Sequence, residues 1–249
     1  RDRFDQLSET EHREAIRHYL AYCTYEDYLF GQLLEELEKT GQADNTLVIY
    51  TSDHGDYMGD HGLWCKGLPC FEGAYDIPFI ARWPRGIHSP GRRESSYITL
   101  ADFAPTFLNL AGIETVDDKD RVNGSTLKGT PARRFAGQSL IPFFEGCNPE
   151  SFIDEVFTQS NGNELYGIQR SIRTGEFKYV YNGFDYDELY DLTRDPLETK
   201  NVLDDPDYKE ILRTLSGRLW KFAYSNGEQS INPYVMVSLA PFGPAQAFR

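Results

Sequence analysis

What the sequence has little of already excludes several classes of protein. No apolar run approaches the roughly 20 residues that a membrane-spanning helix needs, so we expect no membrane span. The 25 Lys and Arg residues are outnumbered by 39 Asp and Glu, which gives a net charge of −14. A chain this acidic is a poor partner for nucleic acid or for an anionic membrane surface. Its first residues, RDRFDQ, also lack the apolar segment of a signal peptide.

Cysteine is scarce, and the four present do not have the spacing of a structural zinc site. They are Cys23, Cys65, Cys70 and Cys147. Four residues separate Cys65 from Cys70, and no second pair completes a set of four ligands. A local Cys65–Cys70 disulfide would fit a secreted or periplasmic protein. Buried free thiols are the alternative.

A long helix followed by a short strand is predicted at the start of the chain. Ser8 and Glu11 form a capping-box pattern, which predicts a helix from about Glu9 to Lys39 with Gly41 as its left-handed cap. Apolar residues at helical spacing predict one buried stripe: Ile16, Tyr19, Leu20, Cys23, Phe30, Leu33, Leu34 and Leu37. The apolar run Leu47–Tyr50 then predicts a buried strand, and the two together form one unit of a layered α/β sheet.

Later segments change from an α/β to an antiparallel pattern. Strands are predicted at 77–83, 155–159, 167–173, 176–181 and 188–192, and helices at 102–110 and from Pro206 onward, capped by Asp205. One face of the last helix carries Tyr208, Ile211, Leu212, Leu215, Leu219 and Phe222. The polar stretch 114–134 predicts a surface loop or a lid over a substrate.

The predicted fold is therefore α/β. Residues 1–160 would form part of a doubly wound sheet, and residues 161–249 a small subdomain of antiparallel sheet plus helix that ends in a surface tail. Open parallel sheets usually have about five or six strands, whereas only two core strands can be recognised in the first portion. We therefore expect this chain to be part of a larger domain.

Most of the candidate chemistry lies between Leu47 and Glu72. Asp53 and His54 follow the predicted strand directly, and Gly55 lets the backbone turn so that both side chains can bind one ion. This oxygen–nitrogen pair suits Ca2+, Mn2+ or Zn2+ without selecting among them. The alternative is a polar turn in which Asp53 caps backbone amides.

Lys66 and His61 are the other candidates in this stretch. Lys66, partly shielded by Trp64, would bind a tetrahedral anion, or its stem would simply lie on the indole at the surface. His61 would act as a general acid or as a structural histidine bonded to the loop backbone. Asp56 and Asp60 are expected to stabilise the loop.

The segments NTLVIYTSDHGDYMGDHGLWCKG and CFEGAYDIPFIARWP resemble the second conserved region of type I sulfatases, in the alkaline phosphatase superfamily. The likeness extends over most of residues 8–203. It implies that Asp53 and His54 bind the active-site divalent metal and that Lys66 binds the sulfate group as the catalytic residue. We also expect His61 to be a substrate-binding residue. Many sulfatases have Asn at the position of His54. The Asp-His pair is similar to choline sulfatases, iduronate-type sulfatases and phosphonate monoester hydrolases, so a phosphonate or phosphodiester hydrolase is an alternative.

The chain departs from this family at the nucleophile, a formylglycine made within a Cys/Ser-x-Pro-x-Arg motif that does not occur here. Neither Cys65 nor Cys70 begins such a motif. The resemblance thus implies the C-terminal half of a sulfuric ester hydrolase, with the formylglycine and the missing strands supplied by an N-terminal half. It also implies Ca2+ as the metal, a sulfated carbohydrate as the substrate, and a periplasmic or secreted location. We expect residues 1–249 alone to be inactive. A non-catalytic fragment that binds a sulfated glycan is the remaining alternative.

Overall fold

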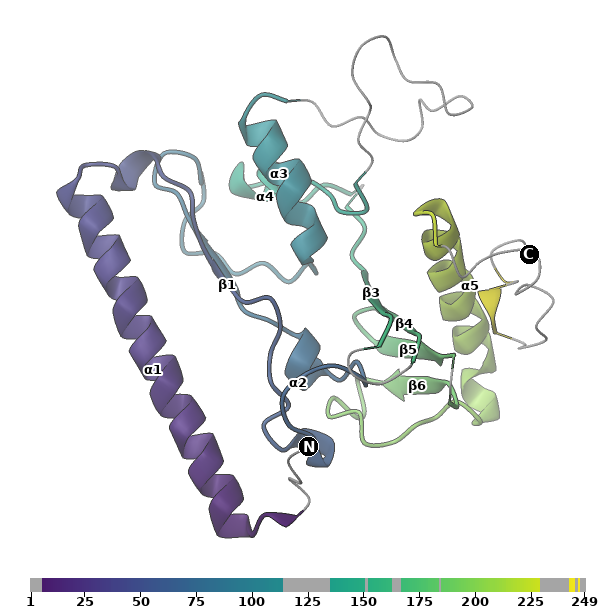
Figure 1. The fold of residues 1–249 in the computed structure, drawn as a ribbon. Helices are drawn as coiled ribbons and strands as arrows, with labels where there is room; N and C mark the ends of the chain where they lie inside the picture. Colours follow the sequence, from purple (N-terminus) through teal and green to yellow (C-terminus); the bar gives the residue numbers. More distant parts are fainter. Residues whose placement is uncertain are drawn as a thin grey trace.

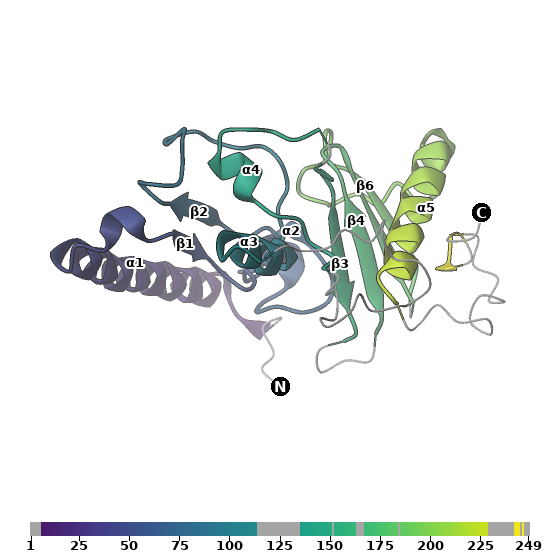
Figure 2. The ribbon, with the colours of Figure 1, turned by 90° about the horizontal axis from the view of Figure 1, so that it is seen from above.

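The computed structural model describes residues 6–113, 135–150, 152–162, 167–183, 185–228, 242–244 and 246. Two groups of elements lie side by side (Figure 1). The first contains the long helix α1 and a two-stranded sheet, and the second is a four-stranded sheet with helix α5 on one face (Figure 2). The predicted loop at 114–134 lies outside the described residues. No described helix is long and apolar enough to cross a membrane.

The first group runs from the N-terminal helix to a short helix before the second sheet. Its elements are α1 (Glu9–Lys39), η2 (Ala43–Asn45), β1 (Val48–Thr51), η3 (Asp60–Gly62), α2 (Glu72–Tyr75), β2 (Phe79–Arg82), η4 (Leu100–Asp102), α3 (Phe103–Leu110) and α4 (Ile141–Phe144). The predicted bounds of α1 are confirmed, as are the capping box of Ser8 and Glu11 and the left-handed Gly41. The two predicted strands also form, but β1 and β2 pair with each other antiparallel and are not part of a parallel sheet among the described residues.

The predicted buried stripe of α1 is wrong over much of its length. Tyr19, Leu20, Cys23 and Leu33 are exposed, and α1 has no fully buried residue. A helix buries its apolar face only where another element covers it, and the described elements cover only part of α1. Near its C-terminal end the ring of Phe30 packs edge-on against Tyr50 of β1, with centroids 5.1 Å apart.

The second group is the predicted antiparallel region, enlarged by one strand. Its elements are β3 (Val156–Ser160), β4 (Gln169–Arg173), β5 (Phe177–Asn182), β6 (Glu188–Asp191), η6 (Pro206–Tyr208) and α5 (Lys209–Ser225). The sheet order is β3-β4-β5-β6, and every neighbouring pair is antiparallel. Since β3 pairs with β4, this sheet includes strands on both sides of residue 160.

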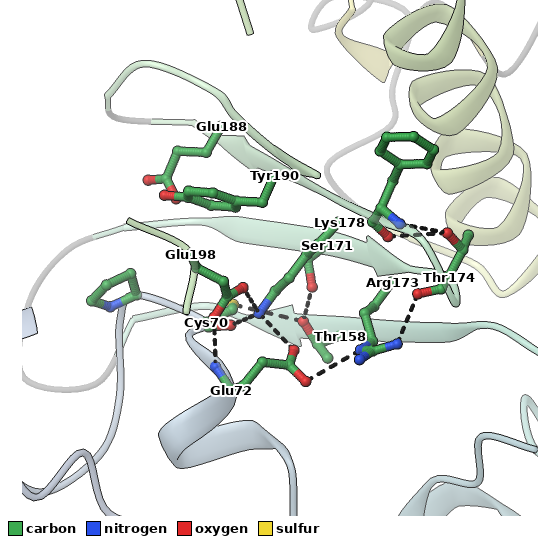
Figure 3. Close-up of polar contacts among 12 residues, drawn as sticks. Cys70, Glu72, Thr158, Ser171, Arg173, Thr174, Lys178, Glu188, Tyr190 and Glu198 are labelled. Atoms are coloured by element: carbon green, nitrogen blue, oxygen red, sulfur yellow. Dashed lines mark hydrogen bonds and ion pairs between the residues drawn. The ribbon is translucent and has the colours of Figure 1, made fainter. Parts of the chain in front are cut away.

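The main core lies between this sheet and α5. Successive strand residues point to opposite faces, so Ile172, Tyr179 and Leu189 form one cross-strand row toward the helix. Leu212, Leu215 and Leu219 of α5 pack onto that row and are buried as predicted. The tail after α5 was predicted to lie at the surface, but its described residues pack against this core. Phe242 contacts the core, and its carbonyl accepts a 2.7 Å hydrogen bond from Trp220 Nε1. The opposite face of the sheet is polar and lies toward α2 (Figure 3).

Candidate active site

The loop after β1 is fixed by hydrogen bonds of its own backbone. Gly55 N donates to Ala74 O of α2 at 2.9 Å, and Tyr57 N donates to Cys65 O at 3.0 Å. Asp56 Oδ1 accepts from Met58 N at 2.9 Å and from Cys65 N at 3.1 Å. Asp56 thus stabilises the loop, as predicted. The loop is therefore folded back on itself and anchored to the first turn of α2.

Unfavourable backbone conformations are concentrated in this loop. Met58, His61 and Cys65 have φ angles of 54°, 53° and 65°. Non-glycine residues rarely adopt such values, which persist only when the surrounding structure holds them. Only one other described residue that is not glycine, Glu198, has a positive φ. Since strain of this kind gathers at functional sites, it supports the loop as the place of the chemistry.

The loop brings three of the predicted site residues together. The Nζ atom of Lys66 lies 2.6 Å from His54 Nε2, and Asp53 Oδ2 lies 3.5 Å from the same nitrogen. His54 Nδ1 is 2.8 Å from Gly55 O, which can only accept, so Nδ1–H is the donor of this hydrogen bond. The other ring nitrogen, Nε2, faces Lys66 Nζ. A carboxylate, an imidazole and a cation meet at one partly exposed point.

The donor set at this point fits a divalent metal. A backbone carbonyl that binds Nδ1–H is the usual way in which a metal-binding histidine is oriented. Ligands that share one such ion lie roughly 3 Å apart, because each is about 2.0–2.6 Å from the ion. The separation of 3.5 Å between Asp53 Oδ2 and His54 Nε2 agrees with this, and the Lys66 ammonium shows that the position accepts a cation. Among the described residues, no cluster of three or more His, Cys, Asp or Glu side chains could hold an ion, so further ligands would come from elsewhere.

His61 lies on another part of the loop. Its ring stacks on Phe71 with centroids 3.7 Å apart and planes 5° from parallel. This stacking contact does not involve Asp53, His54 or Lys66. Its role in binding substrate stays a prediction.

Tyr57 is a structural residue that sequence reasoning missed. Its side chain is 1% exposed, and its hydroxyl donates to Gly67 O at 2.8 Å and also to Pro69 O. Burial, together with the nearby Cys70 thiol, raises the pKa of Tyr57 well above its ordinary value. These bonds hold the backbone that directly follows Lys66, at Gly67 and Pro69. Nothing in the spacing of DHGDYMGDHG distinguishes a buried tyrosine from an exposed one.

The cysteines are free thiols in this structure. Cys65 is exposed and Cys70 is buried, so the disulfide that the sequence allowed does not form here. Cys70 Sγ donates to Gln169 Oε1 at 2.7 Å, and burial raises the pKa of this thiol. Cys147 begins Cys-Asn-Pro-Glu-Ser, which lacks the arginine of the formylglycine motif.

Two family descriptions match the chain. Residues 1–113 match "Sulfatase", and residues 59–225 match "N-sulphoglucosamine sulphohydrolase, C-terminal". The chain belongs to the type I sulfatase family of the alkaline phosphatase superfamily. The site loop at 53–66 falls within the first match and partly within the second.

Individual relatives agree with this assignment. The chain is 33% identical over 211 residues to the N-acetylglucosamine-6-O-sulfatase of Bacteroides thetaiotaomicron, covering 82% of this chain and 36% of the relative. A structure solved in complex with its substrate D-glucosamine-2-N,6-O-disulfate is 30% identical, with a TM-score of 0.73 over 87% of this chain and 42% of that one. The phosphonate monoester hydrolase of Agrobacterium radiobacter is 29% identical, with a TM-score of 0.69 over 80% of this chain and 39% of that one. These structures confirm an α/β, sulfatase-like fold, and this chain spans about a third to a half of its relatives' length.

Proposed function

We propose that this chain is the C-terminal portion of a metal-dependent sulfuric ester hydrolase that acts on a sulfated carbohydrate. The observation that carries the proposal is the convergence of Asp53, His54 and Lys66 at one point of a strained, anchored loop. Relatives that act on sulfated sugars support the substrate class. The doubly wound sheet would be completed by strands outside this chain, and a periplasmic or secreted location stays a prediction.

Each site residue has a distinct task in this proposal. Asp53 and His54 would hold the divalent metal, most simply Ca2+, which when bound supplies positive charge toward the sulfuryl oxygens. Lys66 would place a second, fixed positive charge on those oxygens, where it acts most strongly as negative charge develops in the transition state. Because His54 Nδ1 donates to the Gly55 carbonyl, Nε2 is the atom that would bind the metal, in place of its present contact with Lys66 Nζ.

The nucleophile would come from outside residues 1–249. The family typically uses a formylglycine, and no Cys/Ser-x-Pro-x-Arg motif occurs in this chain. Peptide mapping of the full-length protein should find that motif upstream of the present Arg1, with its Cys or Ser at the mass of formylglycine. A full-length protein with no such motif would leave the proposed reaction without its nucleophile.

The Lys66 assignment can be tested by substitution in the full-length protein. Lys66→Ala should lower kcat/KM for a sulfate ester by a factor on the order of 10² or more, as loss of one preorganised charge contact does. Lys221→Ala removes an exposed lysine of α5 and is the matched control, expected to act like wild type. Equal activity of both variants would return Lys66 to an ordinary surface lysine.

A phosphorus ester hydrolase is the second candidate, favoured by the likeness to a phosphonate monoester hydrolase. The same charges would bind a phosphonate or a phosphodiester. Turnover of p-nitrophenyl sulfate and of a phosphate diester by the full-length protein separates the two. A preference for the diester by kcat/KM would overturn the sulfatase proposal.

A further inference from the structure

A cluster of buried and partly buried charges joins the site loop to the four-stranded sheet (Figure 3). Arg173 on β4 and Lys178 on β5 are cross-strand neighbours on the polar face, opposite the core packed by α5. Both bind the carboxylate of Glu72, the first residue of α2: Lys178 Nζ is 3.0 Å from Oε1, and Arg173 Nε is 3.2 Å from Oε2. Glu198 completes the cluster, since its Oε1 lies 2.7 Å from Lys178 Nζ and its Oε2 accepts from Glu72 N at 2.9 Å.

Lys178 is the centre of this cluster. Its side chain is almost completely buried, and its third partner, besides the two carboxylates, is the carbonyl of Cys70. Lys178 Nζ donates hydrogen bonds to Cys70 O and Glu72 Oε1, and its contact with Glu198 Oε1 is an ion pair. Pairing with the carboxylates of Glu72 and Glu198 offsets the cost of burying the Lys178 cation. The cluster therefore fixes the backbone of residues 70–72 to the sheet.

That short segment is connected to both sides of the candidate active site. Glu72 begins α2, and the Ala74 carbonyl of the same helix holds Gly55 N, next to His54. Just before the segment, the carbonyls of Gly67 and Pro69 accept from Tyr57 OH, and Gly67 follows Lys66. Residues 70–72 therefore lie beside two sets of hydrogen bonds. One holds Gly55, next to His54, and the other holds Gly67, next to Lys66.

We propose that Lys178 is a positioning residue for this site. By fixing residues 70–72 to the sheet it holds in place the hydrogen bonds of Gly55 and Gly67, and so keeps the neighbouring residues His54 and Lys66 side by side. A displacement of about 1 Å in a catalytic group is enough to slow a reaction on the order of 10²-fold. The consequence for turnover rests on the proposed function, whereas the consequence for the loop rests on the contacts alone.

The test compares two buried cations of the same sheet in the full-length protein. Lys178→Met removes the proposed positioning charge. Arg170→Met is the matched control, because Arg170 on β4 is equally buried and is paired with Glu228 at 2.6 Å. Its other partners, the carbonyls of Ser160 and Gln169 and the side chain of Asn161, lie outside the site loop. Both variants should lose stability, so stability alone does not decide between them.

Two readouts separate positioning from general destabilisation. Lys178→Met should speed hydrogen exchange at the amides of Gly55, Tyr57 and Cys65 at least 10-fold and lower kcat for a sulfate ester at least 10-fold. Arg170→Met should leave both within about twofold. Equal changes in the two variants would overturn the proposal.

The two readouts also keep this proposal apart from the proposed function. Absence of turnover by the wild-type protein would remove the proposed function, while the exchange rates would still decide whether Lys178 holds the loop. If Lys178→Met does not fold, Glu198→Gln weakens the same cluster at constant size. It should speed exchange at the same three amides, and unchanged rates there would count against the positioning role.

Discussion

Replacing Gly55 by alanine should break the contact between the site loop and α2. A Cβ atom at residue 55 would lie 2.3 Å from the Gly73 carbonyl oxygen and 3.2 Å from Ala74 Cα. Ordinary contact begins near 3.4 Å, so the two segments would have to separate by about 1 Å. Both close atoms belong to the backbone of the facing segment, so no side-chain rotation can relieve the overlap.

The expected loss of stability follows from this geometry. Forced overpacking costs about 1–3 kcal/mol, and stretching the 2.9 Å bond from Gly55 N to Ala74 O removes about 1 kcal/mol more. Urea unfolding of the chain should therefore show Gly55→Ala destabilised by roughly 2–4 kcal/mol. The same variant of the full-length protein should lose activity, because residue 55 follows His54.

Gly217→Ala is the matched control for this prediction. Gly217 lies inside α5, and an added Cβ would meet no atom of the described residues within 4 Å. Alanine there should stabilise the chain by about 0.5–1 kcal/mol, since it favours the helix. If Gly55→Ala were as stable as wild type, the close approach of the loop to α2 would be refuted.

Two further predictions concern the buried groups beside the loop. Tyr57→Phe removes the hydroxyl that holds Gly67 O and should cost about 1 kcal/mol in urea unfolding at neutral pH. Burial raises the pKa of Tyr57, so above pH 10 the unfolded chain loses this proton while the folded chain keeps it, and stability falls as pH rises. Tyr57→Phe should make that alkaline loss less steep by about 1.4 kcal/mol per pH unit, and an unchanged slope would contradict the buried hydroxyl. A thiol reagent should label Cys23, Cys65 and Cys147 quickly in the native chain and Cys70 only after denaturation, whereas slow labelling of Cys65 would indicate the disulfide.

Local sequence signals predicted most of the elements. The capping box of Ser8 and Glu11 placed the start of α1, and Asp205 with Pro206 placed the start of the last helix. Short β-branched and aromatic runs between residues 167 and 192 predicted the antiparallel strands. The DHG segment together with Lys66 predicted the residues that meet at the site. Such signals succeed because each depends on neighbours within a few residues.

Burial was less predictable, because it depends on partners far away in the sequence. The apolar residues of α1 gave the expected periodicity, yet Leu20 and Leu33 are exposed because no described element covers them. Conversely, Lys178 alternates with core residues along β5, which is the pattern expected of a lysine exposed to solvent. It is buried instead, because it pairs with Glu72, which is 106 residues away in the sequence. The pairing of β1 with β2 depends on the chain's path between them, which periodicity does not describe.

The most direct test of this account is to measure hydrolysis of sulfate esters, sulfated carbohydrates included, by the full-length protein and by residues 1–249 alone, side by side. The account predicts turnover by the full-length protein that Asp53→Ala abolishes, and none by residues 1–249. Comparable turnover by residues 1–249 alone, lost on Asp53→Ala, would contradict it, because the nucleophile would then have to lie within this chain.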